Sequence, residues 1–588
     1  MQSHSIKFLG TLLLVAAPAF AQRSPVTALR FGALVDATGR STPDAVVVVQ
    51  ADTILAVGTG ARAIPARARV VDLRRYTAIP GLIDVHTHMT YWRDKANPTG
   101  PVPRSKDSVV MMAAENARRT LETGVTTVRD LGASNYADIA MRDSINKGAM
   151  IGPRMFVAGY GLSKVTIAPS AGTPSTAPRG RVRDTSEIKE AIKAQVAAGA
   201  DWIKMYGSTG SFQNVTGVQT FTDAEMRVAT ETAHRYGKPI AIHSYGESGG
   251  RAAILAGAES VEHPAGLDDA TLAEWARRGT MYVPTIDHNR FYAENAALLG
   301  YSVAQVAALD SFRLFNLETA RRAHRAGVKF AMGSDVVYWM HGENTRELAW
   351  FVKAGMTPAQ ALATATTNGA ALLRMPTKLG KIAPGYYADI VAVDGNPLRD
   401  IDVILNRVVW VMKGGAVVVD KRTVGSLPAA TQARTVMLLN YAATVPARWT
   451  ARTPASSMRL AEFVVPGVGG KDSAEVVVYY FGAGQGGGIQ ANLARWKSQF
   501  SDPAGQPVFE RVTRDSSGAM PLTIAEYRGT YARGIGAGAA PGAARPNHTL
   551  IAVVAETPRG TLFFQLFGPA KAVETARETY LGFVRGMR

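Results

Sequence analysis

The sequence of 588 residues contains no cysteine. It therefore forms no disulfide, offers no thiolate to a zinc ion and carries no lipid on a cysteine at a signal boundary. Any bound metal must use nitrogen and oxygen ligands. Long hydrophobic runs are lacking as well: none reaches the ~20 apolar residues that span a bilayer, so we expect no transmembrane segment.

Basic runs are also missing, although Lys and Arg number 65 against 47 Asp and Glu. The basic residues are scattered and not interleaved with aromatic ones, so we expect no nucleic-acid partner. The formal net charge of +18 favours a basic envelope protein with weak attraction to anionic surfaces. Hydrophobic residues make up 47% and charged residues 19% of the chain, which indicates a folded globular protein and excludes a disordered one.

The first 21 residues have the features of an export signal. Lys7 lies in a short polar start, residues 8–17 are an apolar stretch, and residues 19–21 form a small-x-small cleavage site. A membrane anchor is the alternative, but the apolar stretch is well short of ~20 residues. We expect a mature chain that begins near Gln22 and is periplasmic or secreted.

The chain is long enough for two or three packed units. Residues 22–79 are typical of short strands and turns, residues 80–375 alternate short apolar runs with helical patterns, and residues 376–425 return to strands. Residues 426–435, rich in Ala, Thr and Pro, indicate a linker. Residues 436–588 have strands and helical patterns of their own, enough for a separate α+β domain.

Eight short apolar runs lie between residues 80 and 375, with helical patterns between them. They span residues 82–86, 126–131, 155–158, 202–206, 240–243, 260–263, 281–285 and 330–335. Eight strands and their helices over roughly 250 residues is the size of a TIM barrel. The predicted fold class is therefore α/β, a (β/α)₈ TIM barrel with a small β-sandwich formed by the segments before and after it, plus the C-terminal α+β domain.

Six polar side chains stand on these runs or close to their ends. In a TIM barrel the C-terminal strand ends converge on one mouth, so the six would meet there. Four of them are histidines, of which the chain has only ten. The six residues are His86, His88, Lys204, His243, His263 and Asp335.

The chemistry of these residue types favours a two-metal centre. His86 and His88 alternate along an extended chain, so both imidazoles face one side and can bind one ion. Lys204 among metal ions would be driven to its neutral amine, which can capture CO₂. The resulting carbamate can bridge two divalent cations roughly 3.5 to 4 Å apart. Asp335 can ligate a metal and carry a proton from the attacking water to the leaving nitrogen.

Each residue taken alone has a plainer interpretation. A His-x-His pair is more often ordinary surface or core histidine, Lys204 could extend its amine to solvent, and Asp335 could cap a helix. The joint placement of the six at matching strand ends favours the metal site. With nitrogen and oxygen ligands only, we expect zinc, and manganese, iron or cobalt would fit the same set.

Several longer motifs surround these residues. They are Ala-Ile-Pro-Gly-Leu-Ile-Asp-Val-His-Thr-His (78–88), Gly-Val-Thr-Thr-Val-Arg-Asp-Leu-Gly (124–132), Gly-Ala-Asp-Trp-Ile-Lys-Met-Tyr (199–206), Ala-Ile-His-Ser (241–244), Ser-Val-Glu-His-Pro (260–264), Gly-Ser-Asp (333–335) and Gly-Lys-Ile-Ala-Pro-Gly-Tyr-Tyr-Ala-Asp-Ile-Val (380–391). With them, residues 28 to about 420 resemble the metal-dependent amidohydrolases, in the branch of imidazolonepropionase-like and prolidase-like proteins.

The resemblance implies a role for each of these residues. His86, His88 and Asp335 would bind one metal, His243 and His263 the other, and carboxylated Lys204 would bridge them. A hydroxide held between the two ions would attack the substrate carbonyl.

Two further residues are predicted to contact the substrate. Tyr206 lies two residues beyond Lys204 and therefore on the same face of its strand, and His341 follows Asp335 in a loop at the same mouth. Barrel packing for Tyr206 and simple exposure for His341 are the alternatives. In place of the Gly-Gly-His stretch that dipeptidase relatives carry after the third strand, this chain has Ser163-Lys164-Val165-Thr166-Ile167-Ala168-Pro169, which puts dipeptidase specificity in doubt.

The predicted function is that of an exported metal-dependent hydrolase that cleaves a C–N bond of a small molecule. Dipeptides, N-acyl amino acids and cyclic amides are the candidate substrates. An ester or lactone hydrolase with the same site is one alternative, and a non-catalytic envelope binding protein is another. The presence of all six ligands speaks against the last. Formation of a homo-oligomer is left open.

Overall fold

The structure is a computed structural model. It describes residues 25–587 apart from 37, 94–97, 99–104, 166–179, 212–214, 423–433, 440, 453–458, 468–471, 481–485, 503–505, 517–519, 532–543 and 558–559. The predicted signal peptide, residues 1–21, and residues 426–433 of the predicted linker lie outside the described residues. The last two linker residues, Arg434 and Thr435, already belong to strand β17. Within the described residues, no helix combines the length and apolar character that crossing a membrane requires.

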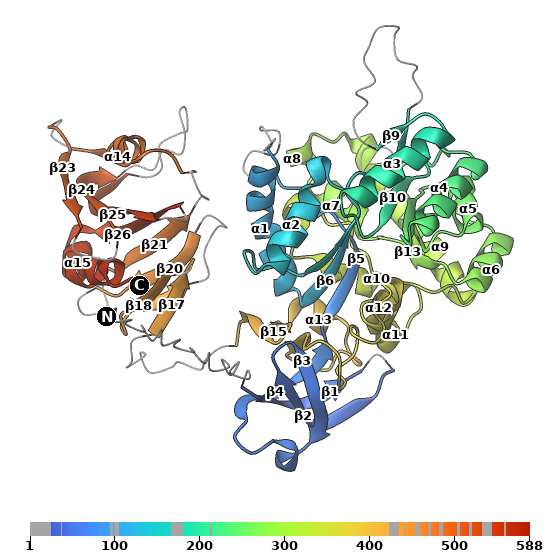
Figure 1. The fold of residues 1–588 in the computed structure, drawn as a ribbon, viewed down its shortest axis with the longest axis horizontal. Helices are drawn as coiled ribbons and strands as arrows, with labels where there is room; N and C mark the ends of the chain where they lie inside the picture. Colours follow the sequence, from blue (N-terminus) through green and yellow to red (C-terminus); the bar gives the residue numbers. More distant parts are fainter. Residues whose placement is uncertain are drawn as a thin grey trace, which may run out of the picture.

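A ring of parallel strands with helices around it forms the central domain (Figure 1). Its strands pair in two groups, β5 (Leu82–Thr87), β6 (Val125–Asp130) and β7 (Arg154–Val157), then β10 (Ile203–Tyr206), β11 (Ile240–His243), β12 (Ser260–Glu262) and β13 (Met281–Val283). The amides of Asp201 and Trp202 donate to the Val157 carbonyl and so join the two groups on one side.

The eighth position of the ring is filled by an extended segment. Phe330 forms a parallel bridge with Tyr282 of β13, and Val336 forms one with Thr87 of β5. The ring is thereby closed as a TIM barrel. Each of the seven strands begins and ends within two residues of its predicted position.

The helices of this domain lie outside the ring (Figure 1). They are α1 (Lys106–Glu122), α2 (Ala137–Asn146), α3 (Thr185–Ala197), α4 (Asp223–Arg235), α5 (Glu247–Ala256), α6 (Asp269–Arg278), α7 (His288–Glu294), α8 (Ala296–Leu299), α9 (Val303–Arg325), α10 (Glu347–Lys353), α11 (Pro358–Thr364) and α12 (Thr367–Leu372). Short polar side chains fix where several of them begin, because each accepts a first-turn backbone N–H. These caps are Ser105, Asp184, Thr222, Asp268, Ser302 and Thr357.

Smaller elements complete the domain. Two short strands, β8 (Ser163–Lys164) and β9 (Arg181–Val182), pair with each other after β7. The 3₁₀ helices η2 (Ser134–Tyr136), η3 (Tyr338–Met340) and η4 (Asn344–Arg346) also belong to this domain, whereas η1 (Ala61–Ala63) lies ahead of the barrel in the sequence.

Segments from before and after the barrel form one sheet, as predicted. Its order is β16-β15-β14-β4-β1-β2-β3, and antiparallel pairing of β4 with β14 joins the segments that precede and follow the barrel. The strands are β1 (Thr27–Val35), β2 (Ser41–Gln50), β3 (Thr53–Thr59), β4 (Arg69–Pro80), β14 (Ile390–Val393), β15 (Val408–Lys413) and β16 (Ala416–Asp420), with helix α13 (Asp402–Asn406) between β14 and β15.

The predicted sandwich form of this sheet is not confirmed. The strands belong to a single hydrogen-bonded sheet, which curls until Thr53 of β3 pairs with Tyr387 ahead of β14. Register shifts within several strand pairs favour this bending. Val391 and Val411 of the sheet share a core with Leu82 and Val125 of the barrel, so the sheet supports the barrel directly.

The C-terminal domain is α+β, as predicted. Its sheet has the order β19-β20-β21-β26-β25-β24-β22, with β23 also paired to β24, and β17 and β18 form a separate hairpin. The elements are β17 (Arg434–Leu438), β18 (Tyr441–Val445), β19 (Thr450–Arg452), β20 (Arg459–Val465), β21 (Ala474–Tyr480), α14 (Ile489–Lys497), β22 (Phe500–Ser501), β23 (Phe509–Asp515), β24 (Leu522–Tyr531), β25 (Arg545–Thr557), β26 (Gly560–Pro569) and α15 (Ala570–Arg585).

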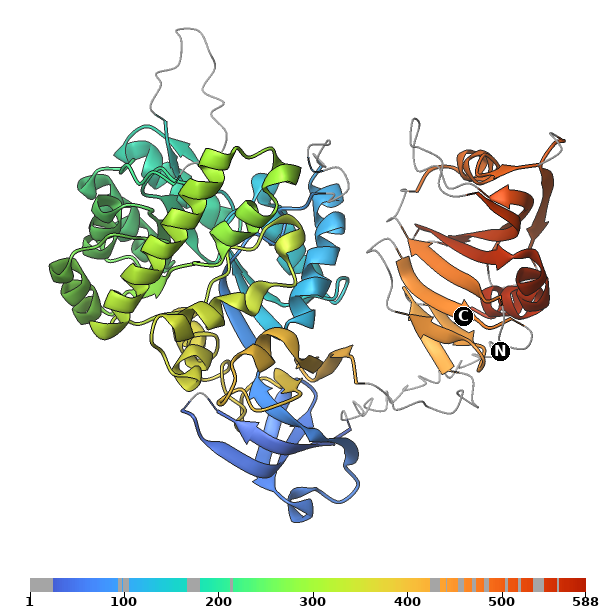
Figure 2. The same ribbon diagram turned by 180° about the vertical axis from the view of Figure 1, so that it is seen from behind.

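The two helices of this domain cover opposite faces of its sheet (Figure 2). Along β25, Ile551 belongs to the core under α15, whereas its neighbour Leu550 belongs to the core under α14. This alternation is expected because successive side chains of a strand point to opposite faces.

Candidate metal centre

All six predicted ligands line one pocket of about 110 Å³. They reach it from the C-terminal ends of the barrel strands, where β5 supplies His86, β10 supplies Lys204 and β11 supplies His243. His88 and His263 directly follow β5 and β12, and Asp335 ends the eighth segment. All six side chains are buried. The predicted convergence is therefore what the structure shows.

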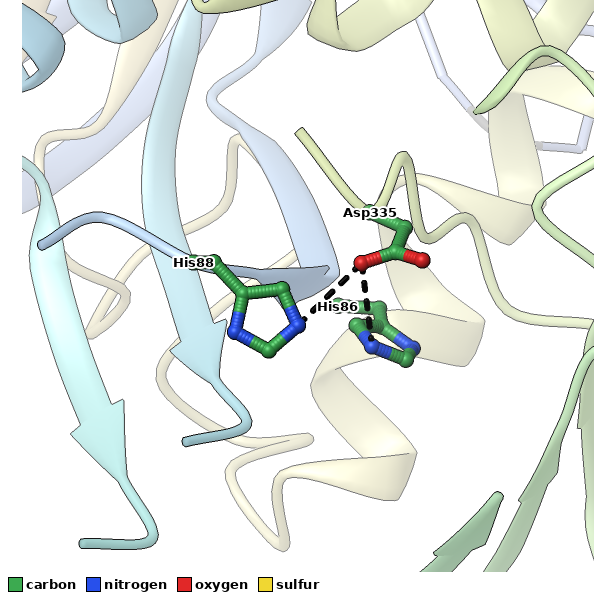
Figure 3. A group of neighbouring side chains, drawn as sticks. All are labelled: His86, His88 and Asp335. Carbon is green, nitrogen blue, oxygen red and sulfur yellow. Dashed lines mark ion pairs between the residues drawn. The ribbon is translucent and has the colours of Figure 1, made fainter. Parts of the chain in front are cut away.

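Three of these residues form a compact donor group (Figure 3). Asp335 Oδ1 lies 3.2 Å from His88 Nε2 and 3.5 Å from His86 Nε2. One donor atom from each of the three residues lies within 4.8 Å of the other two. Two imidazole nitrogens and a carboxylate oxygen at this spacing suit a divalent cation such as zinc.

The other ring nitrogens of His86 and His88 are held from outside the pocket. His86 Nδ1 donates to Glu262 Oε2 over 2.8 Å, and His88 Nδ1 donates to the Gly132 carbonyl over 3.2 Å. Because both partners only accept, they place the proton on Nδ1 and leave Nε2 as a free donor atom toward the pocket. This is the second contact that a metal-binding histidine ordinarily makes.

His243 and His263 are oriented in the same manner. His243 Nε2 donates to the Gly210 carbonyl over 3.1 Å, and His263 Nδ1 is hydrogen-bonded to Thr285 Oγ1. His263 Nε2 then points into the pocket, 4.0 Å from Asp335 Oδ2. The two imidazole rings lie 4.7 Å apart, centre to centre, and both line the pocket that holds the first donor group.

Burial favours the neutral form of three of these imidazoles. It lowers the pKa of His86 to about 4, that of His243 to about 3, and that of His263 well below its usual value. Burial acts against the charged form of Asp335, but His288, His86 and His88 hold the pKa of its carboxyl well below the usual range. Neutral imidazoles and an ionised carboxylate are the protonation states in which these groups bind metal.

A buried ion pair stands behind His86. Arg129 Nη2 lies 3.0 Å from Glu262 Oε1, and neither side chain has exposed surface. Arg129 also donates to Ser260 and to the Val85 carbonyl, and its guanidinium covers the Trp202 ring. This pair was not predicted, because nothing in the sequence indicates that Arg129 of β6 and Glu262 of β12 are in contact.

Lys204 is buried where an ammonium is poorly accommodated. Burial is the main reason why the pKa of its amine is lowered to about 8; Glu262 and Asp335 oppose this shift, and the Arg129 guanidinium adds to it. No described carboxylate lies within 4.0 Å of its Nζ, which lies 5.4 Å from the centre of the Tyr206 ring. A substantial neutral fraction is therefore present near pH 8, and a neutral amine is the form that can react with CO₂.

Comparison with known proteins identifies the family. Residues 77–418 match the sequence profile of the Amidohydrolase family, which is more than half of the chain. This chain belongs to the amidohydrolase family. It is a hydrolase that acts on C–N bonds, and the family generally binds metal.

Individual relatives agree with this assignment. The amidohydrolase is 29% identical to ochratoxinase from Aspergillus niger over 425 residues, which cover 66% of this chain and 86% of that protein. It is 26% identical to imidazolonepropionase from Symbiobacterium thermophilum over 360 residues, covering 55% and 76%. A crystal structure of a Xaa-Pro dipeptidase with bound methionine matches 67% of this chain and 99% of its own, with a TM-score of 0.61 and 31% identity.

The backbone of the amidohydrolase adopts left-handed conformations at three positions around the pocket. His263 has φ 72°, Thr285 φ 51° and Asp335 φ 53°, values that residues other than glycine rarely adopt. Two of these residues are predicted ligands, and the third holds the His263 ring. Such strain persists where the surrounding structure imposes it and clusters at functional sites.

Asp84 links the first strand to the eighth segment. Its carboxylate accepts from the backbone N–H of His86 and Ser334, and from Asn344 Nδ2 over 3.0 Å. Burial raises the pKa of this carboxyl to about 6. Asp84 thereby fixes the spacing between His86 and the segment that carries Asp335.

Aromatic side chains and one further histidine complete the pocket wall. Tyr206 lines it, as predicted, and so do Tyr91, Tyr245 and Tyr292. His288, at the start of α7, has its Nε2 3.4 Å from Asp335 Oδ2. Sequence analysis missed His288 as a pocket residue, although it stands three residues after the seventh predicted run, close to a strand end like the predicted ligands.

His341, which the sequence predicts to contact the substrate, does not line the pocket in this structure. The side chain has no exposed surface and is not among the pocket residues. Its Nδ1 lies 3.1 Å from Thr120 Oγ1 of α1, and its Nε2 lies 3.4 Å from the His88 carbonyl. The loop after Asp335 packs this ring behind His88, where it supports the chain that carries the ligand.

Proposed function

We propose that the chain is an exported amidohydrolase with two divalent metal ions, which cleaves an amide or peptide-like C–N bond of a small molecule. One observation carries this proposal. Five imidazoles, a carboxylate and a buried lysine line the same pocket. Four of these imidazoles, those of the predicted ligands, each have one ring nitrogen engaged by the protein.

The donor set fits two metals. His86, His88 and Asp335 would hold one ion, and His243 and His263 the other. Carboxylated Lys204 would bridge them, since a buried amine with no carboxylate partner among the described residues is suited to become a carbamate. Zinc is the proposed metal because the donors are nitrogen and oxygen only. When bound, the ions would polarise the scissile carbonyl and lower the pKa of a coordinated water.

The protein's own residues would position the substrate and move the proton. Asp335 has its pKa held well below the usual range, so its carboxylate is ionised and can take a proton from the attacking water and deliver it to the leaving nitrogen. The phenol of Tyr206, whose pKa burial raises to about 12, stays protonated and can donate a hydrogen bond to the substrate carbonyl.

A dipeptide or an N-acyl amino acid is the proposed substrate class. The Xaa-Pro dipeptidase structure supports it, because that protein holds methionine in its active site. The tyrosine-rich wall suits an apolar or aromatic group next to the scissile bond. Cyclic amides and lactones would reach the same centre and are the classes to test alongside.

A substrate screen with matched variants tests this proposal. The purified chain is assayed against dipeptides, N-acyl amino acids, cyclic amides and lactones, together with Asp335→Asn and the control Asp269→Asn. Asp269 is exposed on α6, where it pairs with Arg322. We expect amide hydrolysis that is lost only in Asp335→Asn. Hydrolysis of lactones alone, or equal rates for all three proteins, would contradict the proposal.

Export is a separate part of the proposal and has its own test. The signal features of residues 1–21 predict a mature chain that begins near Gln22. N-terminal sequencing of the protein recovered from the periplasm or medium should give that start. A full-length chain retained inside the cell would contradict export and would leave the assignment as a hydrolase unchanged.

A further inference from the structure

The C-terminal domain contains a second pocket, about 340 Å³ in volume. It lies outside residues 77–418, the region that matches the amidohydrolase family. Its lining residues come from β20, β21, β24, β25 and β26 and from the chain just before β22. The pocket is therefore a feature of the appended domain and is distinct from the hydrolase centre.

Strand register explains the floor of this pocket. Val477 of β21 pairs with Gln565 of β26, and Leu550 of β25 pairs with Phe567 of β26. Paired residues point to the same face of a sheet, here the face on which α14 packs. Val477 and Leu550 are buried, so the floor is apolar, with the amide of Gln565 set into it.

The wall beside this floor is aromatic. The rings of Tyr531 and Phe567 lie 4.4 Å apart, tilted by 48°. Tyr479 lines the opposite end of the pocket, where the Arg459 guanidinium lies 5.5 Å from the centre of its ring. Flat apolar groups pack well against such surfaces.

Two guanidinium groups and one carboxylate, that of Glu475, line the pocket. Arg459 is already paired, since its Nη1 lies 2.8 Å from Glu462 Oε1. Arg545, which pairs in register with Tyr531, has no carboxylate within 4.0 Å among the described residues. The undescribed stretches between residues 440 and 559 contain no aspartate or glutamate.

We infer that this pocket binds a small organic carboxylate with a flat apolar body. The carboxylate pairs with Arg545, because a guanidinium fork matches the geometry of two carboxylate oxygens. The apolar body lies against Tyr531, Phe567 and the floor. The Glu475 carboxylate would repel a second acidic group on the ligand, so the ligand is a monoanion. A volume of about 340 Å³ is in the usual range for small-molecule sites.

Titration calorimetry on the full-length chain tests this inference with 2-naphthoate as the probe and uncharged 2-naphthamide as its neutral match. We expect 2-naphthoate to bind one site per chain, at least about tenfold more tightly than 2-naphthamide, because the amide lacks the charge-assisted bond. Equal affinity for the two probes would overturn the inference.

Variants locate the site. Arg545→Gln should weaken 2-naphthoate binding at least about tenfold, and Gln565→Trp should abolish it by filling the floor. The control is Arg511→Gln, since Arg511 pairs with Glu526, which also binds Arg577 of α15 on the other face of the sheet. Binding that survives Arg545→Gln and is lost in Asp335→Asn would belong to the hydrolase centre and would overturn the inference. Hydrolase activity should be unchanged in Arg545→Gln, so this test is independent of the proposed function.

Discussion

The Lys204 ammonium would be costly where the structure places it. The side chain is buried beside Tyr206 and lines the same pocket as five imidazoles. Burial lowers the pKa of the amine to about 8. Conversion to a carbamate replaces an unfavourable buried cation with an anion that two metal ions can stabilise.

This leads to the first prediction. Lys204→Ala should lower kcat for amide hydrolysis by about a thousand-fold or more, because the bridging anion is lost. Protein stripped of metal and CO₂ should recover activity only when metal and bicarbonate are added together. Activity assays with and without bicarbonate check this. Full recovery with metal alone under CO₂-free conditions would show that Lys204 acts without a carbamate.

Glu262 lies behind the pocket, and its contacts are expected to support both the stability of the fold and metal binding. Burial works to raise the pKa of its carboxyl, but the Arg129 guanidinium and the hydrogen bond from His86 lower it to about 2. Glu262→Gln would leave Arg129 buried without an ionic partner. We expect a loss of about 3 to 5 kcal/mol of unfolding free energy and about 10- to 100-fold weaker metal binding. Glu274→Gln, an exposed glutamate that pairs with Arg277, should melt as the parent protein does.

The lowered pKa of the Glu262 carboxyl predicts that the stability of the protein depends on pH. Its pKa is lower in the folded state than its usual value of 4.5, so the unfolded chain binds more protons in that interval and stability falls as the pH drops from about 4.5 toward 2. The stability gap between the parent protein and Glu262→Gln should therefore narrow over this range. Denaturant titrations at pH 7, 4.5 and 3 measure the gap, and a gap that widens on acidification would contradict the account.

For individual residues, the sequence indicated the predicted ligands better than the residues that hold them in place. The convergence of the six predicted ligands could be predicted because a barrel brings strand ends together wherever they lie in the sequence. The pairing of Glu262 with Arg129 could not be predicted, because the sequence around a charged residue in an apolar run does not indicate which residue it pairs with. The buried place of His341 could not be predicted, because the path of the loop after Asp335 depends on packing against α1 and not on strand order.

Among the elements, the eighth barrel segment approaches the first strand very closely. At Gly333, a Cβ atom would lie 2.4 Å from Val283 Cγ1 and 2.7 Å from His86 Cβ. Only a residue without a side chain fits between β13 and β5 at this point. The position of Asp335 relative to His86 depends on this contact.

Gly333→Ala should therefore displace His86 or Asp335. We expect a stability loss of about 1 to 3 kcal/mol from overpacking, together with loss of bound metal and of most of the activity. The matched control is Gly582→Ala in α15, where an added Cβ meets no atom within 4 Å and should stabilise the helix by about 1 kcal/mol. Metal analysis and kcat/KM are measured for both variants. A Gly333→Ala protein that keeps its bound metal and its catalytic rate would contradict the claim that this close contact positions Asp335.

Barrel strands were more predictable than the other elements. Parallel strands buried on both faces are continuous apolar runs, and β11 coincides with its predicted range. The curled sheet was harder, because pairing of β4 with β14 joins residues some 310 positions apart. Its curl depends on register shifts such as that between Val48 and Val49, which leave no clear sequence pattern.

On the scale of the whole molecule, the hydrolase centre and the C-terminal domain are built from separate stretches of chain. The pocket residues of the centre lie between His86 and Val337, and the sheet that supports the barrel ends with β16 at Asp420. The two cores of the C-terminal sheet consist of residues from Leu438 onward.

A chain truncated after Arg422 should therefore fold and keep its activity. We expect kcat/KM within about twofold of the full-length value, and two thermal unfolding transitions in the full chain against one in the truncated chain. Calorimetry and activity assays measure both. A truncated chain that is folded but inactive would show that the C-terminal domain contributes to catalysis.

The central claim is that four histidines, Asp335 and a modified Lys204 hold two metal ions in one pocket. Plasma mass spectrometry of the purified full-length chain, run beside Asp335→Asn, tests it most directly. The account predicts about two divalent ions per parent chain and a clear loss in the variant. A parent protein that hydrolyses its substrate at full rate with only trace metal would contradict it.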